Sequence, residues 1–234
     1  MHKRIVMSRT YQQSSMTNDH LREQDPENRL LARGPRRRLS PFAIRDTALF
    51  VSGLLQEDIG GPSVKPYMPP GIWRSISNAT YKQDHGEKLY RRSMYTYWRR
   101  TVPPPTMMAF NAAARESCAV RNELTTTPLQ ALTLLNNVTF VEAARLLAER
   151  LLKARELTTD RDRIEWAFRA ITSRQPSDDE IKILQDDLAR FRIDFKNRPA
   201  TAKLLLMVGE KPHDPELDLS ATAAFTLVAN TIFN

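Results

Sequence analysis

With 234 residues, 41% hydrophobic and 26% charged, the chain is long enough to bury one large core or two small ones, and its composition is not that of a disordered protein. The single cysteine, Cys118, excludes an internal disulfide, a CxxCH haem attachment and a cysteine-based zinc site, and we expect it to be a buried, inert thiol. The longest apolar runs are too short to span a bilayer, and the net charge of +8 makes an anionic partner one hypothesis.

Proline and glycine interrupt residues 1–124 at short intervals, which predicts loops between short elements. One helix stands out in this part. Ser40 is a suitable N-cap, and an apolar side that includes Leu54 and Leu55 follows it. We expect the helix to end before Gly60.

Helical patterns continue from residue 127 to the end. Residues 127–130, TPLQ, form a capping box that predicts a helix through 135, interrupted by two asparagines. A second helix is predicted over 139–155, with Arg145 and Glu149 on its solvent side. A third is predicted over 160–173.

The clearest amphipathic helix begins at the next capping box, PSDDE at 176–180. A last helix is predicted over 220–234. The predicted fold class is mainly α, with an irregular, Pro/Gly-rich N-terminal half packed on a C-terminal helical bundle. We expect a single domain, with a loop-rich basic half at 1–124 and a helical half at 125–234.

The charge is unevenly spread. Residues 1–117 contain 19 Lys/Arg and 10 Asp/Glu, whereas residues 118–234 contain 16 and 17. Arginine supplies 26 of the 35 basic residues, and its planar fork suits bidentate contacts to carboxylate, sulfate or phosphate. Either the first half meets an anionic partner, or its arginines form internal ion pairs.

The most distinctive passage is residues 89–100, LYRRSMYTYWRR. Its four arginines, Arg91, Arg92, Arg99 and Arg100, are interleaved with tyrosine and tryptophan residues. As a strand or as a helix, the block could bind a sulfated or carboxylated glycan, or stack nucleic-acid bases. The competing interpretation places the rings in the core and pairs the arginines with acidic residues of the helical half.

A second set of anion-binding candidates lies in GGPSVKPY at 60–67. The two glycines allow close approach of backbone amides, Lys65 brings a positive charge, and Tyr67 follows. The spacing is not that of a P-loop, so a purely structural loop is the alternative.

Other chemistry has little support in the sequence. The four histidines lack metal-binding spacing, so no metal site is expected. No nucleophile motif is present, and the carboxylate pairs at 178–179 and 186–187 lie on the expected solvent face of a helix. The sequence therefore leans away from an enzyme, and no cofactor is expected in this chain.

Four passages resemble one protein family. They are residues 89–137, DPENRLLARGPR at 25–36, GGPSVKPYMPPGIW at 60–73 and FRAITSRQP at 168–176. Together they are similar to the planctomycete-specific C-terminal domain of unknown function found beside cytochrome-c-like domains in large secreted proteins. Asn111 departs from the family's aspartate, and RNELTTT at 121–127 replaces its RRERTNT. These changes remove charges from a region that could form a polar site.

The resemblance implies an extracytoplasmic or periplasmic location, with haem in an upstream domain of full-length relatives. Residues 5–15 resemble an internal helix of the family domain, and residues 225–234 resemble an ending that continues. The resemblance therefore implies an incomplete domain.

Three functions remain as hypotheses. The first is a non-catalytic interaction or scaffold module that contacts upstream domains of the same protein or a protein partner. The second is part of an enzyme or binding domain acting on anionic, sulfated polysaccharide, with the arginines of 89–100 binding the anion together with Lys65 and Tyr67. The third, a nucleic-acid binder, rests on charge asymmetry alone and ranks last.

Overall fold

The computed structural model describes residues 1–35, 38–76, 78–113, 115, 118 and 125–234. They form two compact units, Met1–Leu39 and Ser40–Asn234. Helices dominate, and the β-structure of the described residues consists of isolated bridges. The predicted mainly α fold class is confirmed. The single domain with a loop-rich basic half at 1–124 and a helical half at 125–234 stays a prediction.

Met1–Leu39 contains two short helices, α1 (His2–Val6) and α2 (Asp19–Gln24). Among the described residues of this unit, Asp25 alone is buried. Most of its large apolar side chains are exposed, including Ile5, Met7, Tyr11, Met16, Leu30 and Leu31. Polar contacts rather than a hydrophobic core therefore hold the unit together.

The second unit opens with α3 (Pro41–Ser52), which Ser40 caps as predicted. The helix ends earlier than its apolar pattern suggested. Gly53 takes a left-handed backbone conformation with φ 79°, which closes the helix. Leu54 and Leu55 therefore lie beyond the helix rather than on its apolar side.

The helical bundle consists of α6 (Pro128–Asn136), α7 (Val138–Lys153), α8 (Asp160–Thr172), α9 (Asp178–Asn197), α10 (Pro199–Leu206) and α11 (Leu219–Phe233). Five of these were predicted: α6, α7, α8 and α11 agree with the prediction to within two residues at each end, and α9 begins at its predicted capping box. The capping boxes at Thr127 and Ser177 form, and Asn137 both ends α6 and caps α7. Helix α10 was not predicted, although Pro199 occupies its first turn.

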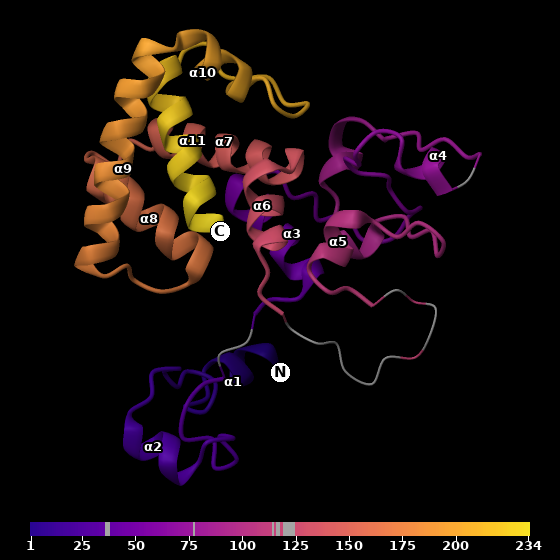
Figure 1. The fold of residues 1–234 in the computed structure, drawn as a ribbon. Coiled ribbons are helices and arrows are strands. Elements are labelled where there is room, and N and C mark those ends of the chain that lie inside the picture. The colour runs from indigo at the N-terminus through magenta and orange to yellow at the C-terminus, as the bar shows by residue number, and fades with distance from the viewer. Residues whose placement is uncertain (36–37, 77, 114, 116–117, 119–124) are drawn as a thin grey trace. The chain divides into compact units, whose positions relative to one another are not determined.

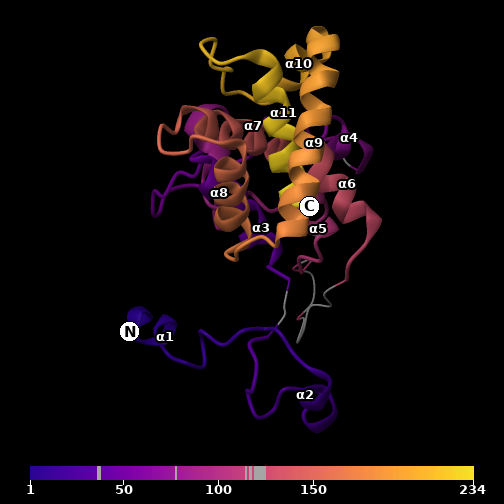
Figure 2. The same ribbon diagram turned by 90° about the vertical axis from the view of Figure 1, so that its left-hand side faces the viewer.

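Helix α11 lies at the centre of the bundle, against α7 and α9 (Figures 1 and 2). The main core combines apolar side chains of these three helices with neighbours from α8 and α10, including Leu147, Leu151, Ile164, Leu188, Leu206, Phe225 and Val228. A second cluster joins α3 to α7 and includes Leu49, Leu89, Tyr90 and Phe140. Helix α7 takes part in both clusters, so it connects the bundle to the loop-rich part of the unit.

The expectation that Arg145 and Glu149 face solvent is wrong. The Arg145 side chain is fully buried, and its Nη1 lies 2.8 Å from Glu149 Oε1. The segment after α10 covers this side of α7, where Arg145 Nη2 donates to Lys211 O at 2.6 Å and Nη1 to Pro212 O at 3.3 Å. Helical periodicity could not reveal this cover, because it comes from a distant part of the chain.

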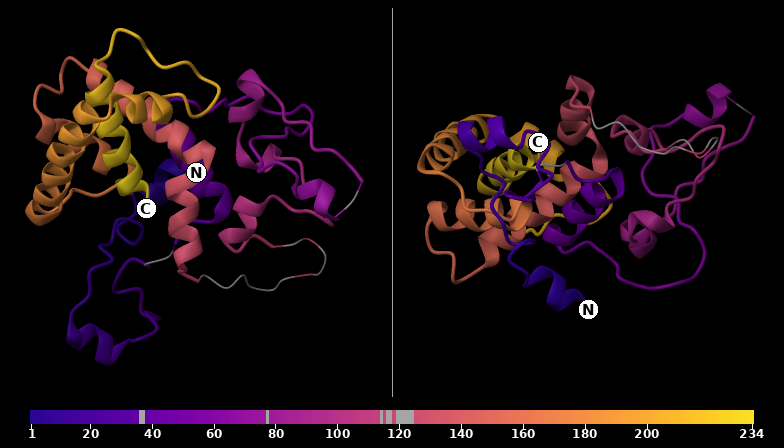
Figure 3. Two further views of the ribbon diagram at one scale, coloured as in Figure 1. Left: turned by 45° about the horizontal axis from the view of Figure 1, so that its top comes forward. Right: turned by 90° about the horizontal axis from the view of Figure 1, so that it is seen from below.

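Between α3 and α6 the described residues form short elements: α4 (Ile72–Ile76), η1 (Gly86–Tyr90), η2 (Ser93–Tyr95) and α5 (Pro105–Ala109). This magenta part extends beside the bundle in Figure 3, left. Farther along the chain, Cys118 is exposed, so the expectation of a buried thiol is wrong. The cysteine belongs to neither hydrophobic cluster.

None of the helices in the described ranges is long and apolar enough to cross a lipid bilayer. The most apolar of the bundle helices, α11, has 15 residues.

Candidate anion-binding face

The Arg/aromatic block of residues 89–100 forms neither a strand nor an α-helix. It folds as the 3-10 turns η1 and η2 and connecting segments. Val64 joins it to the preceding loop: its N–H donates to Tyr95 O at 2.8 Å, and its carbonyl accepts from the Tyr97 N–H at 2.7 Å. These bonds bring Lys65 beside the block, so the two candidate regions meet in one surface.

Cations and aromatic rings alternate on this surface. Lys65 Nζ lies 5.2 Å from the centroid of the Tyr97 ring, and Tyr97 lies 5.9 Å from Trp73, centroid to centroid. The guanidinium carbon of Arg99 lies 4.9 Å from the Trp73 ring. We call these four residues the cation–ring ladder. Trp73 is buried, whereas Tyr97 is 37% exposed.

In the part of the chain that the structure describes, neither Lys65 nor Arg99 forms a salt bridge, whereas most arginines of the bundle do. A contact with an aromatic ring orients a cation but does not neutralise its charge. It also leaves the N–H edge of a guanidinium open to a further partner. The cation–ring ladder therefore carries two positive charges, those of Lys65 and Arg99, which the aromatic rings hold in place.

The segment that contains the ladder also has a net positive charge. Residues 62–102 contain eight Lys/Arg and two Asp/Glu. One of the two acids, Asp84, accepts the backbone N–H of Lys65 at 2.7 Å. An anion that approaches this face is attracted, because the exposed cations outnumber the carboxylates.

Arg91 lies apart from the ladder. Its guanidinium donates to the carbonyls of Asp58, Gly60 and Pro62, at 3.1 Å and 2.9 Å for the first and last. It also stacks on Tyr95 at 3.9 Å. The Arg91 side chain is buried, and its Nη1 and Nη2 donate to backbone oxygens, so Arg91 organises the loop before it.

The remaining candidates occupy different places. Arg92 and Arg100 are exposed, and neither forms an ion pair with any residue that the structure describes. Tyr67 faces another cluster, where its hydroxyl accepts the Glu210 N–H at 2.8 Å. Burial raises the pKa of Tyr67 to about 12. Of the six candidates, Lys65 and Arg99 are thus brought together by the ladder.

A hollow of about 360 Å³ lies beside the ladder, against α4. Trp73 and Tyr81 form part of its wall, edge to face, with centroids 5.2 Å apart. Burial raises the pKa of Tyr81, whose hydroxyl donates to Pro66 O at 2.5 Å. Polar side chains complete the wall: Arg74, Thr80 and Gln83. We call this cavity the Trp73 hollow.

These wall residues were not predicted from the sequence. The available signal was the tryptophan in PPGIW, directly after a proline-glycine turn. Only the fold shows that Trp73 contacts Tyr97 and Arg99, which lie more than twenty positions later in the sequence.

A second polar cluster is buried between α7 and the segment after α10. Glu142 Oε1 accepts from the Tyr90 hydroxyl at 2.9 Å and from the backbone N–H groups of Glu210 and Lys211 at 2.8 Å each. Burial raises the pKa of Tyr90 as well. Because the Glu142 side chain is fully buried, this cluster joins chain segments rather than facing a ligand.

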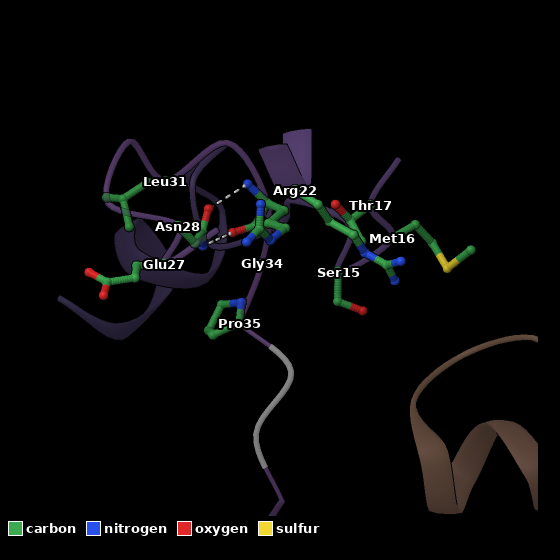
Figure 4. A pocket seen from close by; sticks show the side chains of 10 residues that line it. Ser15, Met16, Thr17, Arg22, Glu27, Asn28, Leu31, Gly34 and Pro35 are labelled. Carbon is green, nitrogen blue, oxygen red and sulfur yellow. Dashed lines mark hydrogen bonds between the residues drawn. The ribbon is translucent and has the colours of Figure 1, made fainter. Parts of the chain in front are cut away.

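A third polar arrangement closes a loop within Met1–Leu39 (Figure 4). The Asn28 side chain donates to Arg33 O at 2.7 Å and accepts from Arg33 N at 3.2 Å. The Asp25 carboxylate accepts the N–H groups of Leu30 and Arg29, which lower its pKa. A hollow of about 480 Å³ adjoins this loop. The hydrogen bonds of Asp25 and Asn28 hold the backbone of the loop formed by DPENRLLARGP.

Among known protein families, the model PSD1, protein of unknown function (DUF1553), matches residues 1–188. No curated protein and no solved structure matches the chain.

Proposed function

Because the chain belongs to the PSD1 family of proteins of unknown function, we propose its role from its own geometry: it is a non-catalytic interaction module of a larger extracytoplasmic, cytochrome-associated protein. The cellular setting is supported by the sequence resemblance alone. The interaction role is supported by the exposed apolar side chains of Met1–Leu39 and by the buried ionisable side chains of Ser40–Asn234.

The observation that carries the proposal is the exposed apolar surface of Met1–Leu39. Leu30 is 80% exposed and Met16 is 78% exposed, while hydrogen bonds hold the local backbone in shape. A unit of this size without an apolar core gains stability when a partner covers such side chains. The partner surface belongs to another domain of the same protein or to a partner protein.

The buried ionisable groups of the second unit support the same role. Arg45 donates to the carbonyls of Leu89 and Arg91, at 2.6 Å and 2.9 Å. Arg145 and Glu142 likewise bind the backbone of the segment after α10. These side chains fix distant loops in place, as a rigid binding surface requires.

Site-specific photo-crosslinking tests the proposal. A benzophenone side chain at Leu30, in the full-length protein in its own cell, should crosslink to one defined surface that mass spectrometry maps to another domain or protein. Ile183 on α9, which is 61% exposed, is the matched control position. The same products from both positions, or none from Leu30, would contradict the interaction role.

A second function, recognition or processing of an anionic polysaccharide, is supported by the cation–ring ladder. Lys65 and Arg99 contact aromatic rings and form no salt bridge with any residue that the structure describes, so their charges are available to an external anion. Retention on heparin should persist at moderate salt and fall for Arg99→Gln. Arg169→Gln, the same charge change at an exposed site on α8, should leave retention unchanged. Equal losses for the two variants would indicate unspecific electrostatics.

A further inference from the structure

The Trp73 hollow combines three kinds of surface. Arg74 supplies a cation, and Thr80 and Gln83 supply hydrogen-bond donors and acceptors. Met68, Pro69 and Pro70 supply apolar surface. The volume of about 360 Å³ falls within the range of small-ligand pockets.

This combination matches one unit of an acidic sugar. A sugar ring has apolar C–H faces and a rim of hydroxyl groups, each of which donates and accepts hydrogen bonds. Thr80 and Gln83 can do both in return, so they suit hydroxyl groups better than a bare carboxylate, which only accepts. Arg74 can pair with a carboxylate or sulfate of the same unit.

The cation–ring ladder and the Trp73 hollow share the Trp73 indole. Arg99 is positioned over the Trp73 ring, and Tyr81 meets that ring edge-on from the hollow. A chain of acidic sugars that places one unit in the hollow could therefore place the charge of the next near Arg99.

The geometry is less suited to nucleic acid. Single-stranded nucleic acids bind proteins largely by stacking bases on open aromatic faces. The Trp73 ring is 7% exposed, with Arg99, Tyr97 and Tyr81 packed around it, so it offers no open face.

We propose that the Trp73 hollow is a subsite for one carboxylated or sulfated sugar unit of an anionic polysaccharide, with Arg74 binding the acid group and Thr80 and Gln83 binding hydroxyls. This inference rests on the polysaccharide function proposed above. Arg99 contributes to the same ligand from the ladder, and Trp73 is a positioning residue for both regions.

Calorimetric titration of the full chain tests the subsite. The probes are a hexamer of galacturonic acid, a heparin hexasaccharide, a neutral cellohexaose and a hexaglutamate peptide. The variants are Arg74→Gln, the double change Thr80→Val with Gln83→Leu, Arg99→Gln and the control Arg169→Gln. Circular dichroism and melting curves establish that each variant is folded.

We expect at least one acidic oligosaccharide to bind. Arg74→Gln should weaken its binding about tenfold, as should Arg99→Gln, because each removes a charge-assisted contact. The hydroxyl-binding double variant should weaken it about fivefold. Cellohexaose and hexaglutamate should bind much more weakly, and Arg169→Gln should have no effect. The two acidic probes distinguish a carboxylated from a sulfated ligand.

The outcomes separate the subsite from the broader function. If Arg99→Gln weakens binding but Arg74→Gln and the double variant do not, the hollow is not the subsite, although the ladder still binds polysaccharide. If no variant differs from Arg169→Gln, or if neither acidic oligosaccharide binds, both proposals fail. Hexaglutamate binding as tight as that of the sugars would replace the saccharide with an acidic peptide.

Discussion

Gly209 lies so close to Glu142 that a Cβ atom on the glycine would stand 2.3 Å from the carboxyl carbon of Glu142. The glycine has φ 95°, and the next two residues donate their N–H groups to the same carboxylate. Gly209 thus allows the backbone to pass directly over a buried charge, which joins the segment after α10 to α7.

Replacing Gly209 with alanine should destabilise the protein by roughly 3 kcal/mol, because the variant combines a left-handed backbone with a steric clash. Gly60→Ala is the matched control. Gly60 has φ 85° but nothing within 4 Å of its Cβ position, so about 1 kcal/mol is expected from the backbone alone. Urea unfolding measures both, and equal losses would show that the contact with Glu142 is not tight.

Removing the Glu142 carboxylate should be more costly than removing one of its donors. Glu142→Leu leaves two backbone N–H groups, the Tyr90 hydroxyl and the buried Arg145 charge without this acceptor, so we expect a loss of about 3–5 kcal/mol. Tyr90→Phe removes one hydrogen bond and should cost about 1 kcal/mol. Denaturant unfolding of the two variants checks the order, and a reversed order would contradict the central role of Glu142.

Glu180 should make stability depend on acid pH. The Arg174 guanidinium, together with the Ser177 N–H, lowers the pKa of Glu180 from 4.5 to about 2. A depressed carboxyl pKa stabilises the fold fully above pH 4.5, and this contribution is lost as the pH falls toward 2. The melting temperature of Glu180→Gln should therefore lie below that of the unmodified protein at pH 6, and the difference should shrink toward zero at pH 2.

Asp179→Asn is the control for this effect. It removes a charge from the same helical turn, but Asp179 has neither the arginine contact nor the capping-box bond of Glu180. A difference for Glu180→Gln that stayed constant between pH 6 and pH 2 would rule out the proposed linkage.

Gly34→Ala should loosen Met1–Leu39 without affecting the second unit. A Cβ on Gly34 would lie 2.6 Å from the carbonyl oxygen of Gln13, where the backbone must shift to make room. We expect amide exchange in this unit to accelerate about tenfold, which corresponds to roughly 1.4 kcal/mol. Leu30→Ala, at an exposed side chain, is the control. Hydrogen exchange followed by mass spectrometry resolves the two units, and unchanged exchange at 25–35 would contradict the prediction.

The sequence predicted part of the candidate site. Lys65 and Arg99 were named from composition and spacing, and they do lie on one face. Arg91 was named on the same grounds, but backbone carbonyls bind its guanidinium. Trp73 was not named, because the proline-glycine turn before it does not by itself distinguish a tryptophan that organises a face from one that fills a core.

The sequence alone determined where helices begin, because Ser40, Thr127 and Ser177 find their capping partners within three residues. Tertiary structure decided what each helix and loop contacts. The Arg145–Glu149 pair has the spacing of a solvent-exposed ion pair, and only the segment after α10 buries it. Local spacing determines backbone conformation, whereas burial and charge pairing depend on residues distant in sequence that packing brings together.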